Sequence, residues 1–215
     1  MSHDAPTPRP AAQRWETPWH PSLDEQLSVD GWQRVRLLHQ MRVDLPLPEA
    51  IVAATRPIEV SPFRAVDLDG LLVVNNRAFE WHPDQGGWDR ERFDRVRAED
   101  WFDPDDLLVH HTDGLVDGFC WTKFHEPVPE DGPDGPRPAA GEIFVIAADP
   151  DTHGTGLGRA LTVAGLQHLQ AAGLSLGVLW VEADNEPAIA LYERLGFRVH
   201  HSDAGYSAAP TEGAG

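Results

Sequence analysis

Residues 141–172 place a glycine-rich turn between an apolar strand and an amphipathic helix. The strand EIFVIAAD leads directly into PDTHGTGLGRALT, with glycines at 154, 156 and 158. Glycine has no Cβ, so the backbone can bend sharply there and direct successive N–H groups toward one anion at the start of the helix. The pattern therefore predicts an anion site, and a pyrophosphate is its expected occupant.

The spacing of these glycines distinguishes the turn from two common nucleotide-binding loops. A Rossmann loop has the pattern GxGxxG with an acidic residue about 20 positions later, whereas Gly154, Gly156 and Gly158 form a GxGxG pattern. A P-loop needs Lys-Ser or Lys-Thr after its last glycine, and neither pair follows here. Taken alone, the turn is also compatible with a strand-to-helix connection that binds no ligand.

A second informative segment is VEADNEPAIALYERLGF, which begins at Val181. Asn185 can cap the helix that starts here and still offer its side-chain amide. Ala188 and Ala190 are small enough for a ligand to approach the helix closely. Tyr192 lies two helical turns after Asn185, so both residues are expected on one face of the helix.

Together, HGTGLGRAL after a strand and EADNEPAIALYERLGF resemble the acetyl-CoA signature of the GNAT superfamily of acetyltransferases. The resemblance implies an α/β (α+β) fold in a single domain, with a mixed central sheet flanked by helices, and acetyl-CoA as co-substrate. It also implies three coenzyme segments: strand residues along the pantetheine arm, turn amides around the pyrophosphate, and helix residues on the other side of the arm. These are Ile146, Ala147 and Ala148; His153, Gly154, Thr155, Gly156, Leu157, Gly158 and Arg159; and Asn185, Glu186, Pro187, Ala188, Ile189 and Ala190.

A closer resemblance covers about residues 32 to 206. The phrases VNNRAFEWHPDQGGW, EDWFDPDDLLV, GFCWTKFH and GEIFVIAADP look like the C-terminal catalytic half of mycothiol synthase, a family that acetylates the cysteinyl amine of cysteinyl-glucosaminyl-inositol. That family has two GNAT repeats, and 215 residues are too few for both. WQRVRLLHQMRVDL resembles the tail of the first repeat. We therefore expect a shortened or single-repeat relative that lacks an acidic substrate contact of that repeat.

Two residues suit the chemistry that the resemblance implies. Attack on a thioester needs a neutral amine and a proton for the departing thiolate. The resemblance assigns Glu142 as the base that takes the ammonium proton, directly or through water, and Tyr192 as the acid that protonates the coenzyme sulfur. Strand N–H groups near Ile146 would polarise the acetyl carbonyl. The alternatives are a solvated glutamate at a strand edge and a core aromatic residue on a helix.

Substrate contacts are implied at Asp84, Lys123, Glu142 and Trp180, and three positions depart from the family pattern. Asp84 stands where the family more often has Glu, which shortens its reach. Trp180 replaces what is usually Tyr, so a hydroxyl contact is lost. His153 stands where Gln or Arg is usual, and we expect only a modest loss because backbone amides do most of the holding. For Asp84, Lys123 and Trp180, surface or core roles remain open alternatives.

The chain is expected to be organised around one catalytic domain. Residues 1–22, rich in Pro, Ala and polar residues, should form a disordered lead, and 23–56 a remnant or extension resembling the end of a lost first repeat. Residues 57–207 should form the acetyltransferase domain, with a mobile Pro- and Gly-rich loop at 127–140. Residues 208–215 look frayed.

Periodicity predicts the elements of this domain. The last five follow a βαβαβ order, which predicts neighbouring parallel strands with crossover helices. A turn of the Asp-Gly type joins two of the earlier strands, and Asp89 is a plausible helix N-cap. The expected strands are 32–45 (strand or hairpin), 58–63, 107–111, 115–125, 141–148, 174–181 and 197–201, and the expected helices are 67–81, 89–99, 156–172 and 186–195.

Composition limits the classes of partner that this protein is expected to bind. Seventeen basic and 35 acidic residues give a net charge of −18, which repels nucleic acids and anionic membranes. Cys120 is the single cysteine, so no internal disulfide can form; we expect a small core residue and not a nucleophile. His110, His111 and His125 are expected to be ordinary residues with no metal bound. With no signal-like leader and no long apolar run, we expect a cytoplasmic protein, either a monomer or paired with a chain that supplies a first repeat.

The sequence thus predicts an N-acetyltransferase that moves acetyl from acetyl-CoA to a primary amine, with cysteinyl-glucosaminyl-inositol as the leading acceptor. Two alternatives stay open. The acceptor can be another amine, such as an amino acid, an antibiotic or a protein N-terminus. A non-catalytic acetyl-CoA-binding module is the second, although the presence of both Glu142 and Tyr192 argues against it.

Overall fold

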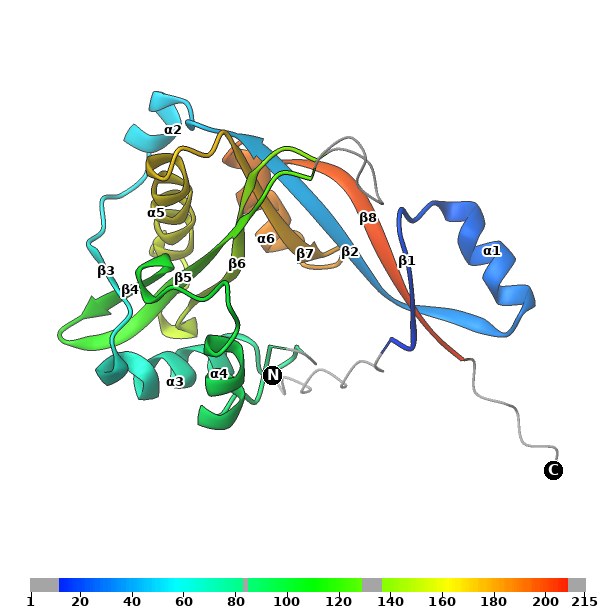
Figure 1. Cartoon of the computed structure of the whole chain (residues 1–215), viewed down its shortest axis with the longest axis horizontal. Helices are drawn as coiled ribbons and strands as arrows, with labels where there is room; N and C mark the ends of the chain where they lie inside the picture. Colours follow the sequence, from blue (N-terminus) through cyan, green and yellow to red (C-terminus); the bar gives the residue numbers. More distant parts are fainter. Residues whose placement is uncertain (1–11, 83–84, 129–136, 209–215) are drawn as a thin grey trace. The chain divides into compact units, whose positions relative to one another are not determined.

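The structure is a computed structural model that describes residues 12–82, 85–128 and 137–208. Within these residues the strands are hydrogen-bonded in the order β1-β8-β2-β7-β6-β5-β4-β3 (Figure 1). The chain forms two compact units: a terminal unit, Met1–Met41 with Trp180–Gly215, and a central unit, Arg42–Leu179. The predicted mixed sheet flanked by helices is confirmed, because the strands pair in both directions.

Each unit contributes its own set of elements. The terminal unit contains β1 (Arg14–Glu16), α1 (Pro21–Val29), α6 (Glu186–Arg194) and β8 (Arg198–Ala208). Two strands run through both units, β2 (Trp32–Asp44) and β7 (Leu176–Glu182). The central unit contains α2 (Glu49–Ala53), β3 (Val60–Pro62), α3 (Leu68–Ala78), α4 (Arg90–Arg97), β4 (Leu107–Thr112), β5 (Leu115–His125), β6 (Ala140–Ala148) and α5 (Leu157–Ala171), with short 3₁₀ turns at Ala65–Asp67, Pro104–Asp106 and Pro150–Thr152.

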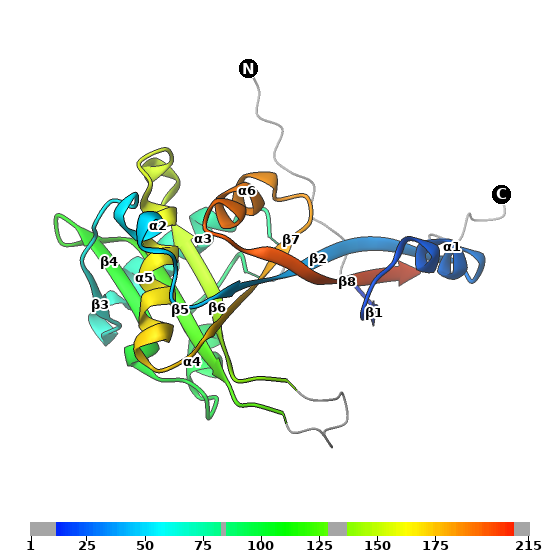
Figure 2. The same ribbon diagram turned by 90° about the horizontal axis from the view of Figure 1, so that it is seen from above.

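In the central unit, helices cover both faces of the sheet. β3, β4, β5 and β6 pair antiparallel, and β7 joins β6 in parallel. Helix α5 lies along β5 and β6 (Figure 2), with close approaches at three glycines: a Cβ on Gly118, Gly141 or Gly165 would come within 2.7 Å of a side-chain atom. The other face carries α3 and an aromatic core that includes Phe93, Phe119 and Trp121.

A bulge in β6 changes which side chains share a face. Trp121 and Thr122 are consecutive on β5, yet they pair with Val145 and Ile143, so Phe144 is an extra residue on β6. Ile143 and Val145 therefore point to opposite faces of the sheet. Glu142 pairs with Lys123, two residues from Trp121 on β5. Both charged residues consequently lie on the aromatic face of the sheet, opposite α5.

The terminal unit is held by a hub at Asp24. The indole of Trp19 and the hydroxyl of Tyr206 donate to Oδ1 of Asp24 at 3.0 and 2.6 Å, and the guanidinium of Arg34 donates to Oδ2 at 3.0 Å. Burial raises the pKa of Asp24, but the hydrogen bonds from Tyr206 and Trp19 and the charge of Arg34 outweigh it, so the net shift is downward. Leu27, Ala204 and Tyr206 are the buried residues of a small apolar cluster in this unit.

Most predicted elements of the catalytic domain are present with boundaries within a few residues of those expected, but the last strand, expected at 197–201, extends to Ala208. Asp89 caps α4, because its carboxylate accepts the N–H of Arg92 at 2.8 Å. Asp113 and Gly114 both adopt positive φ angles in the predicted turn between β4 and β5. The predicted loop at 127–140 and the tail at 208–215 fall mostly outside the described residues.

Two sequence predictions differ from the structure. The βαβαβ order predicts that β7 and β8 are neighbours, whereas β2 lies between them. Strand β2, from the N-terminal region, fills this position. Residues 14–16, expected in the disordered lead, form β1 and pair antiparallel with Ala204–Tyr206 of β8. Helices α1 and α2 were not predicted.

No described helix is long and apolar enough to cross a membrane.

The contact between α5 and β5 predicts the effect of one added methyl group. A Cβ on Gly165 would lie 2.4 Å from Sγ of buried Cys120. Gly165→Ala should therefore lower the free energy of unfolding by about 1–3 kcal/mol. In a double-mutant cycle measured by denaturant unfolding, Cys120→Ala should offset much of that loss, because it removes the clashing sulfur.

The control is Gly158→Ala, also on α5, because a Cβ added at Gly158 would have no heavy atom within 4 Å. It should not lower the unfolding free energy, since alanine favours the helix by about 1 kcal/mol. Equal losses for Gly165→Ala with and without Cys120→Ala would contradict the proposed clash.

The lowered pKa of Asp24 predicts that the free energy of unfolding depends on pH. Its pKa in the folded protein is lowered from the ordinary 3.8. Its stabilising contribution is therefore complete above the unfolded-state value and is lost as the pH falls through the lower folded-state value. Asp24→Asn should cost about 1–2 kcal/mol at pH 7. The difference between the two proteins in unfolding free energy should shrink between pH 5 and pH 2, as followed by urea titration at each pH. A constant difference across that range would refute this role for the carboxylate.

Candidate functional site

The glycine turn lies in the central unit, between β6 and α5. Gly154 and Gly156 have φ angles of +78° and +83°, in the left-handed region that residues with a Cβ rarely adopt. A Cβ on Gly154 or Gly158 would meet no heavy atom within 4 Å. These glycines therefore border open space, and packed side chains do not fill the turn on this side.

The first turn of α5 offers hydrogen-bond donors to an anion. α5 begins at Leu157, and its first turn carries no acidic side chain. The N–H groups of Leu157, Gly158 and Arg159 have no acceptor inside the helix, and the helix dipole adds a partial positive charge there. The oxygens of a phosphate group could accept hydrogen bonds from these donors, and no basic side chain would be needed.

Two of the predicted turn amides are used within the turn itself. The N–H of His153 donates to the carbonyl of Pro150, and that of Thr155 to the carbonyl of Thr152, each at 3.1 Å. Both bonds hold the turn in shape. The donors that remain for a ligand are therefore those of Gly154 and of residues 156–159.

Arginines on neighbouring elements fix both ends of this turn. Arg77 of α3 donates from Nη1 to both oxygens of Asp149, at 2.7 and 2.5 Å, and from Nη2 to Asp151 at 3.0 Å. The hydrogen bond to Asp151 raises the pKa of Arg77, which burial only partly offsets. At the other end, Nε of Arg159 donates to the hydroxyl of Thr55 at 2.9 Å. The turn is thus anchored to α3 and to the α2 region of the same unit.

Within the central unit, strand β6 continues past its last pair with β7 just before the turn. β6 and β7 pair at Gly141, Glu142 and Ile143, opposite Gly177–Leu179, where the central unit's part of β7 ends. β6 itself continues to Ala148 and stays paired with β5 along this length, for example Ile146 with Cys120. Main-chain groups of residues 144–148 on the β7 side therefore face no strand partner among the described residues of the central unit.

Glu142 lies on the aromatic face of the sheet, where its side chain is 12% exposed. Its Oε2 lies 2.6 Å from Nε2 of His125, whose side chain is 42% exposed. Lys123 lies on the same face, with its ammonium 4.2 Å from the ring centroid of Trp101 and 5.5 Å from that of Phe144. A half-buried carboxylate, an imidazole and an ammonium are thus grouped beside aromatic rings. Asp84, predicted as a further substrate contact, lies outside the described residues.

In the terminal unit, Asn185 and Tyr192 occupy the two ends of α6. Oδ1 of Asn185 accepts the N–H of Ala188 at 3.3 Å, so Asn185 is the predicted N-cap. Tyr192 is 9% exposed, and its ring lies 5.7 Å from that of Phe197. The side chain of Tyr192 is therefore nearly buried. Glu142 and Tyr192 belong to different units, and each is described within its own.

Trp180 is a partly exposed aromatic side chain of the terminal unit. It is 36% exposed, and its ring meets that of His201 edge-on at 5.3 Å. An exposed indole supported by a second ring is suited to stacking against a ligand, although a Tyr at this position would also offer a hydroxyl.

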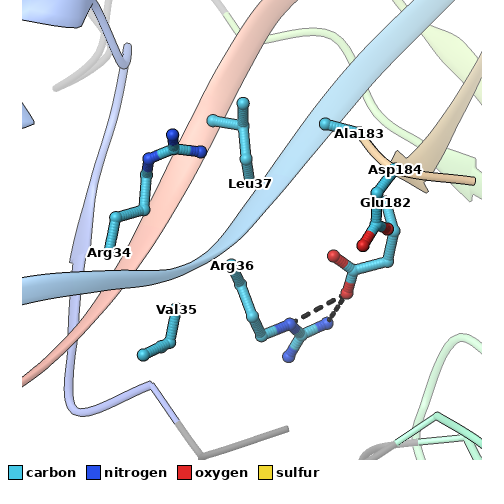
Figure 3. Close-up of a pocket in the computed structure, with 7 residues that line it drawn as sticks. All are labelled: Arg34, Val35, Arg36, Leu37, Glu182, Ala183 and Asp184. Carbon is cyan, nitrogen blue, oxygen red and sulfur yellow. Dashed lines mark hydrogen bonds and ion pairs between the residues drawn. The ribbon is translucent and has the colours of Figure 1, made fainter. Parts of the chain in front are cut away.

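A pocket of about 370 Å³ opens in the terminal unit, between β2 and the end of β7 (Figure 3). Two of the residues that line it form a buried ion pair, in which Nε and Nη2 of Arg36 donate to Oε1 of Glu182 at 2.9 and 2.6 Å. The side chains of the pair are 7% and 3% exposed. The pocket is bordered by the residues that immediately precede Asn185. Its lining consists of Arg34, Val35, Arg36, Leu37, Glu182, Ala183 and Asp184.

Cys120 is buried, and two of the histidines contact carboxylates. Burial raises the pKa of the Cys120 thiol to about 12, which disfavours the thiolate that a nucleophile needs. His110 contacts Asp117 at 2.5 Å, and His111 contacts Asp67 at 3.0 Å. Among the described residues, no cluster of three or more His, Cys, Asp or Glu side chains is arranged to hold a metal ion.

Sequence reasoning missed three residues of the site: His125, Trp101 and Arg77. His125 is two residues beyond Lys123, so strand alternation alone placed both on one face. Its contact with Glu142 also depends on the register between β5 and β6, which the sequence does not reveal. Trp101 and Arg77 act across long separations in the chain, and no local signal pointed to them.

Comparison with known proteins gives the site a family context. The chain is 45% identical over 177 residues to mycothiol acetyltransferase of Acidimicrobium ferrooxidans, covering 80% of this chain and 54% of the relative. It is 39% identical over 207 residues to mycothiol acetyltransferase of Rhodococcus jostii, covering 93% and 65%. The chain thus spans between half and two thirds of the length of these relatives.

Solved structures agree on the fold. The crystal structure of a GCN5-related N-acetyltransferase from Sphaerobacter thermophilus has a TM-score of 0.66 and 21% identity, and the match covers 87% of this chain and 56% of that one. The family model for Acetyltransferase (GNAT) matches residues 74–197, which include the glycine turn, Glu142 and α6. The chain therefore belongs to the GNAT family of acetyltransferases.

Proposed function

We propose that this protein transfers an acetyl group from acetyl-CoA to a primary amine, and that the acceptor is the cysteinyl amine of cysteinyl-glucosaminyl-inositol. The observation that carries the proposal is the open glycine turn at the N-terminus of α5, directly after a strand whose residues 144–148 have no strand partner on the β7 side within the described central unit. GNAT acetyltransferases use acetyl-CoA as co-substrate, and such a turn offers main-chain donors to its pyrophosphate.

Three segments hold the coenzyme in this proposal. The N–H groups of Gly154 and residues 156–159 bind the pyrophosphate, while His153 and Thr155 keep the turn in shape. Main-chain groups of Ile146 to Ala148 pair with the pantetheine arm, much as a neighbouring strand would. Asn185 to Ala190 line its other side, where the small side chains of α6 permit close approach.

The acceptor amine is prepared by Glu142. The amine arrives as an ammonium ion and must lose a proton before it can attack the thioester. Glu142 is half-buried on the aromatic face, where low solvent access strengthens its attraction for a cation. Lys123 lies beside it and binds polar groups of the acceptor. Trp180 and Asp84 are the remaining proposed acceptor contacts.

Tyr192 supplies the proton that the departing coenzyme thiolate requires. Its phenol lies at the end of α6, the helix that also carries the Asn185 to Ala190 segment. N–H groups of β6 near Ile146 stabilise the negative charge that develops on the acetyl oxygen. No covalent enzyme intermediate is involved, consistent with the buried, unreactive thiol of Cys120.

The identity of the acceptor rests on the relatives. Proteins named mycothiol acetyltransferase match most of this chain at 39–45% identity. The match leaves out a third or more of each relative, and Trp180 adds an indole where the family usually has a phenol. Because acetyl-CoA and the cysteinyl acceptor are metabolites of the cell interior, the proposed compartment is the cytoplasm.

A panel of amines tests the proposed acceptor. The purified protein would be given acetyl-CoA with cysteinyl-glucosaminyl-inositol, glucosaminyl-inositol, cysteine, an aminoglycoside or a peptide N-terminus, and release of free CoA would be followed. We expect kcat/KM for the first to exceed the others by about 10²-fold or more, because each of the others lacks either the cysteinyl amine or the sugar and inositol that the site is proposed to contact. Turnover of a different amine alone would overturn the acceptor. Tight acetyl-CoA binding by calorimetry without any turnover would indicate a non-catalytic binding module.

Substitution of the two proposed catalytic residues tests the mechanism. Glu142→Gln and Tyr192→Phe should each lower kcat by about 10²-fold or more, because each removes one positioned proton transfer. The deficit of Glu142→Gln should shrink above about pH 8, where an α-amine deprotonates in water. That of Tyr192→Phe should persist there.

Matched controls separate chemistry from folding. Tyr206 is the second of the two tyrosines, and Glu91 is an exposed glutamate that pairs with Arg95 on α4. Tyr206→Phe should destabilise the protein but leave kcat unchanged, and Glu91→Gln should affect neither. Wild-type kcat in Tyr192→Phe would remove Tyr192 from the mechanism.

A further inference from the structure

The hydrogen bond between Glu142 and His125 links a half-buried carboxylate to an exposed ring. The Oε2–Nε2 distance is 2.6 Å, and the exposed fractions of the two side chains are 12% and 42%. Glu142 pairs with Lys123 across the β5–β6 ladder, and His125 pairs with Ala140. The two residues are therefore diagonal neighbours on one face of an antiparallel pair, and the strand backbones fix their separation.

Among the described neighbours of Glu142 on β5, His125 is the titratable group most exposed to solvent. Across β5, Lys123 faces Glu142, and its ammonium is held over the rings of Trp101 and Phe144. On the β7 side, Glu142 pairs with the apolar residue Val178. Within the described central unit, Lys123 and His125 are thus the charged or titratable groups facing this carboxylate from the neighbouring strands.

We propose that His125 is a positioning residue that holds the Glu142 carboxylate and carries its proton to solvent in each catalytic cycle. This inference rests on the proposed acetyl transfer. A general base that has accepted a proton must lose it before the next turnover, and a base with little solvent access needs a route for that loss. The exposed imidazole, already in hydrogen-bond contact, provides one.

The proton balance is complete with these two side chains and water. An N–H bond of the acceptor ammonium breaks, and an O–H bond forms on Glu142, which leaves a neutral amine. The O–H bond then breaks, and Nε2 of His125 takes the proton to give an imidazolium. The imidazolium gives its Nδ1 proton to bulk water, and proton exchange with water then returns the neutral ring to the Nδ1–H form, whose Nε2 can accept the next proton. The net result is loss of one proton from the ammonium to solvent, with both side chains restored.

The competing interpretation is an ordinary surface ion pair. Such pairs contribute about 0–1 kcal/mol to stability and nothing to chemistry. The central unit offers a matched pair for comparison, because Nε2 of His168 on α5 lies 2.7 Å from Oδ1 of Asp106. Their side chains are 28% and 16% exposed, similar in exposure but separate from Glu142. His168→Gln therefore serves as the control for loss of a His–carboxylate pair.

The experiment compares His125→Ala, His125→Gln and His168→Gln in the full chain. Both His125 variants should lower kcat about 10-fold, and the KM for acetyl-CoA should be unchanged. His125→Gln can keep a hydrogen bond to Glu142 but cannot carry a proton, so it should be no better than the alanine variant. Imidazole added to the buffer should restore much of the kcat of His125→Ala, because a small base can replace the missing ring. His168→Gln should keep wild-type kcat and show no response to imidazole.

Other outcomes are decisive in the opposite direction. Wild-type kcat in His125→Gln, or a loss in His125→Ala that imidazole does not relieve, would reduce His125 to a structural role. Calorimetric titration with CoA and thermal unfolding should be the same for all three variants, which separates a folding defect from a proton-transfer defect. If the wild-type chain acetylates no amine, the proposed function fails and the relay fails with it. If the wild type turns over and the His125 variants match it, only the relay fails.

Discussion

Within the central unit, strand β6 is paired on both edges from Gly141 to Ile143, and the geometry of this unit follows from that stretch. Up to Ile143 the strand is fixed between β5 and β7, so the backbone of Glu142 has a single position. The bulge at Phe144 then turns successive side chains to new faces, one residue beyond the last pair with the central unit's part of β7. From there β6 leads to Asp149, which Arg77 holds in place, and so to the glycine turn. The proposed base lies on this strand, and the proposed anion site directly follows it.

The sequence predicted what local patterns control. The glycine turn, the N-caps at Asp89 and Asn185 and the hairpin at Asp113-Gly114 each depend on residues only a few positions apart, and the structure contains all of them. The family and the mixed sheet followed from the same segments. These features are encoded by the conformational preferences of single residues, which tertiary contacts here did not override.

What the sequence did not predict depends on pairing between distant segments. The position of β2 between β7 and β8 is set by which strands pair, and the contact of His125 with Glu142 is set by a register that a bulge shifts. The hub at Asp24 joins residues 182 positions apart, and the ion pair of Arg36 joins residues 146 positions apart. The partners in each of these contacts can be named only when the strand register or the strand order is known. A short stretch of sequence contains neither.

The terminal unit brings together segments from opposite ends of the described chain. The N–H of Gln13 donates to the carbonyl of Tyr206 at 2.8 Å, and the side chain of Gln13 accepts the N–H of Ala208 at 3.0 Å. A short linker could therefore join these neighbouring positions covalently, and new ends could be opened at a surface turn such as Asp113-Gly114. The fold thus lends itself to circular permutation, in which the order of the elements along the chain changes while their hydrogen-bonded neighbours stay the same.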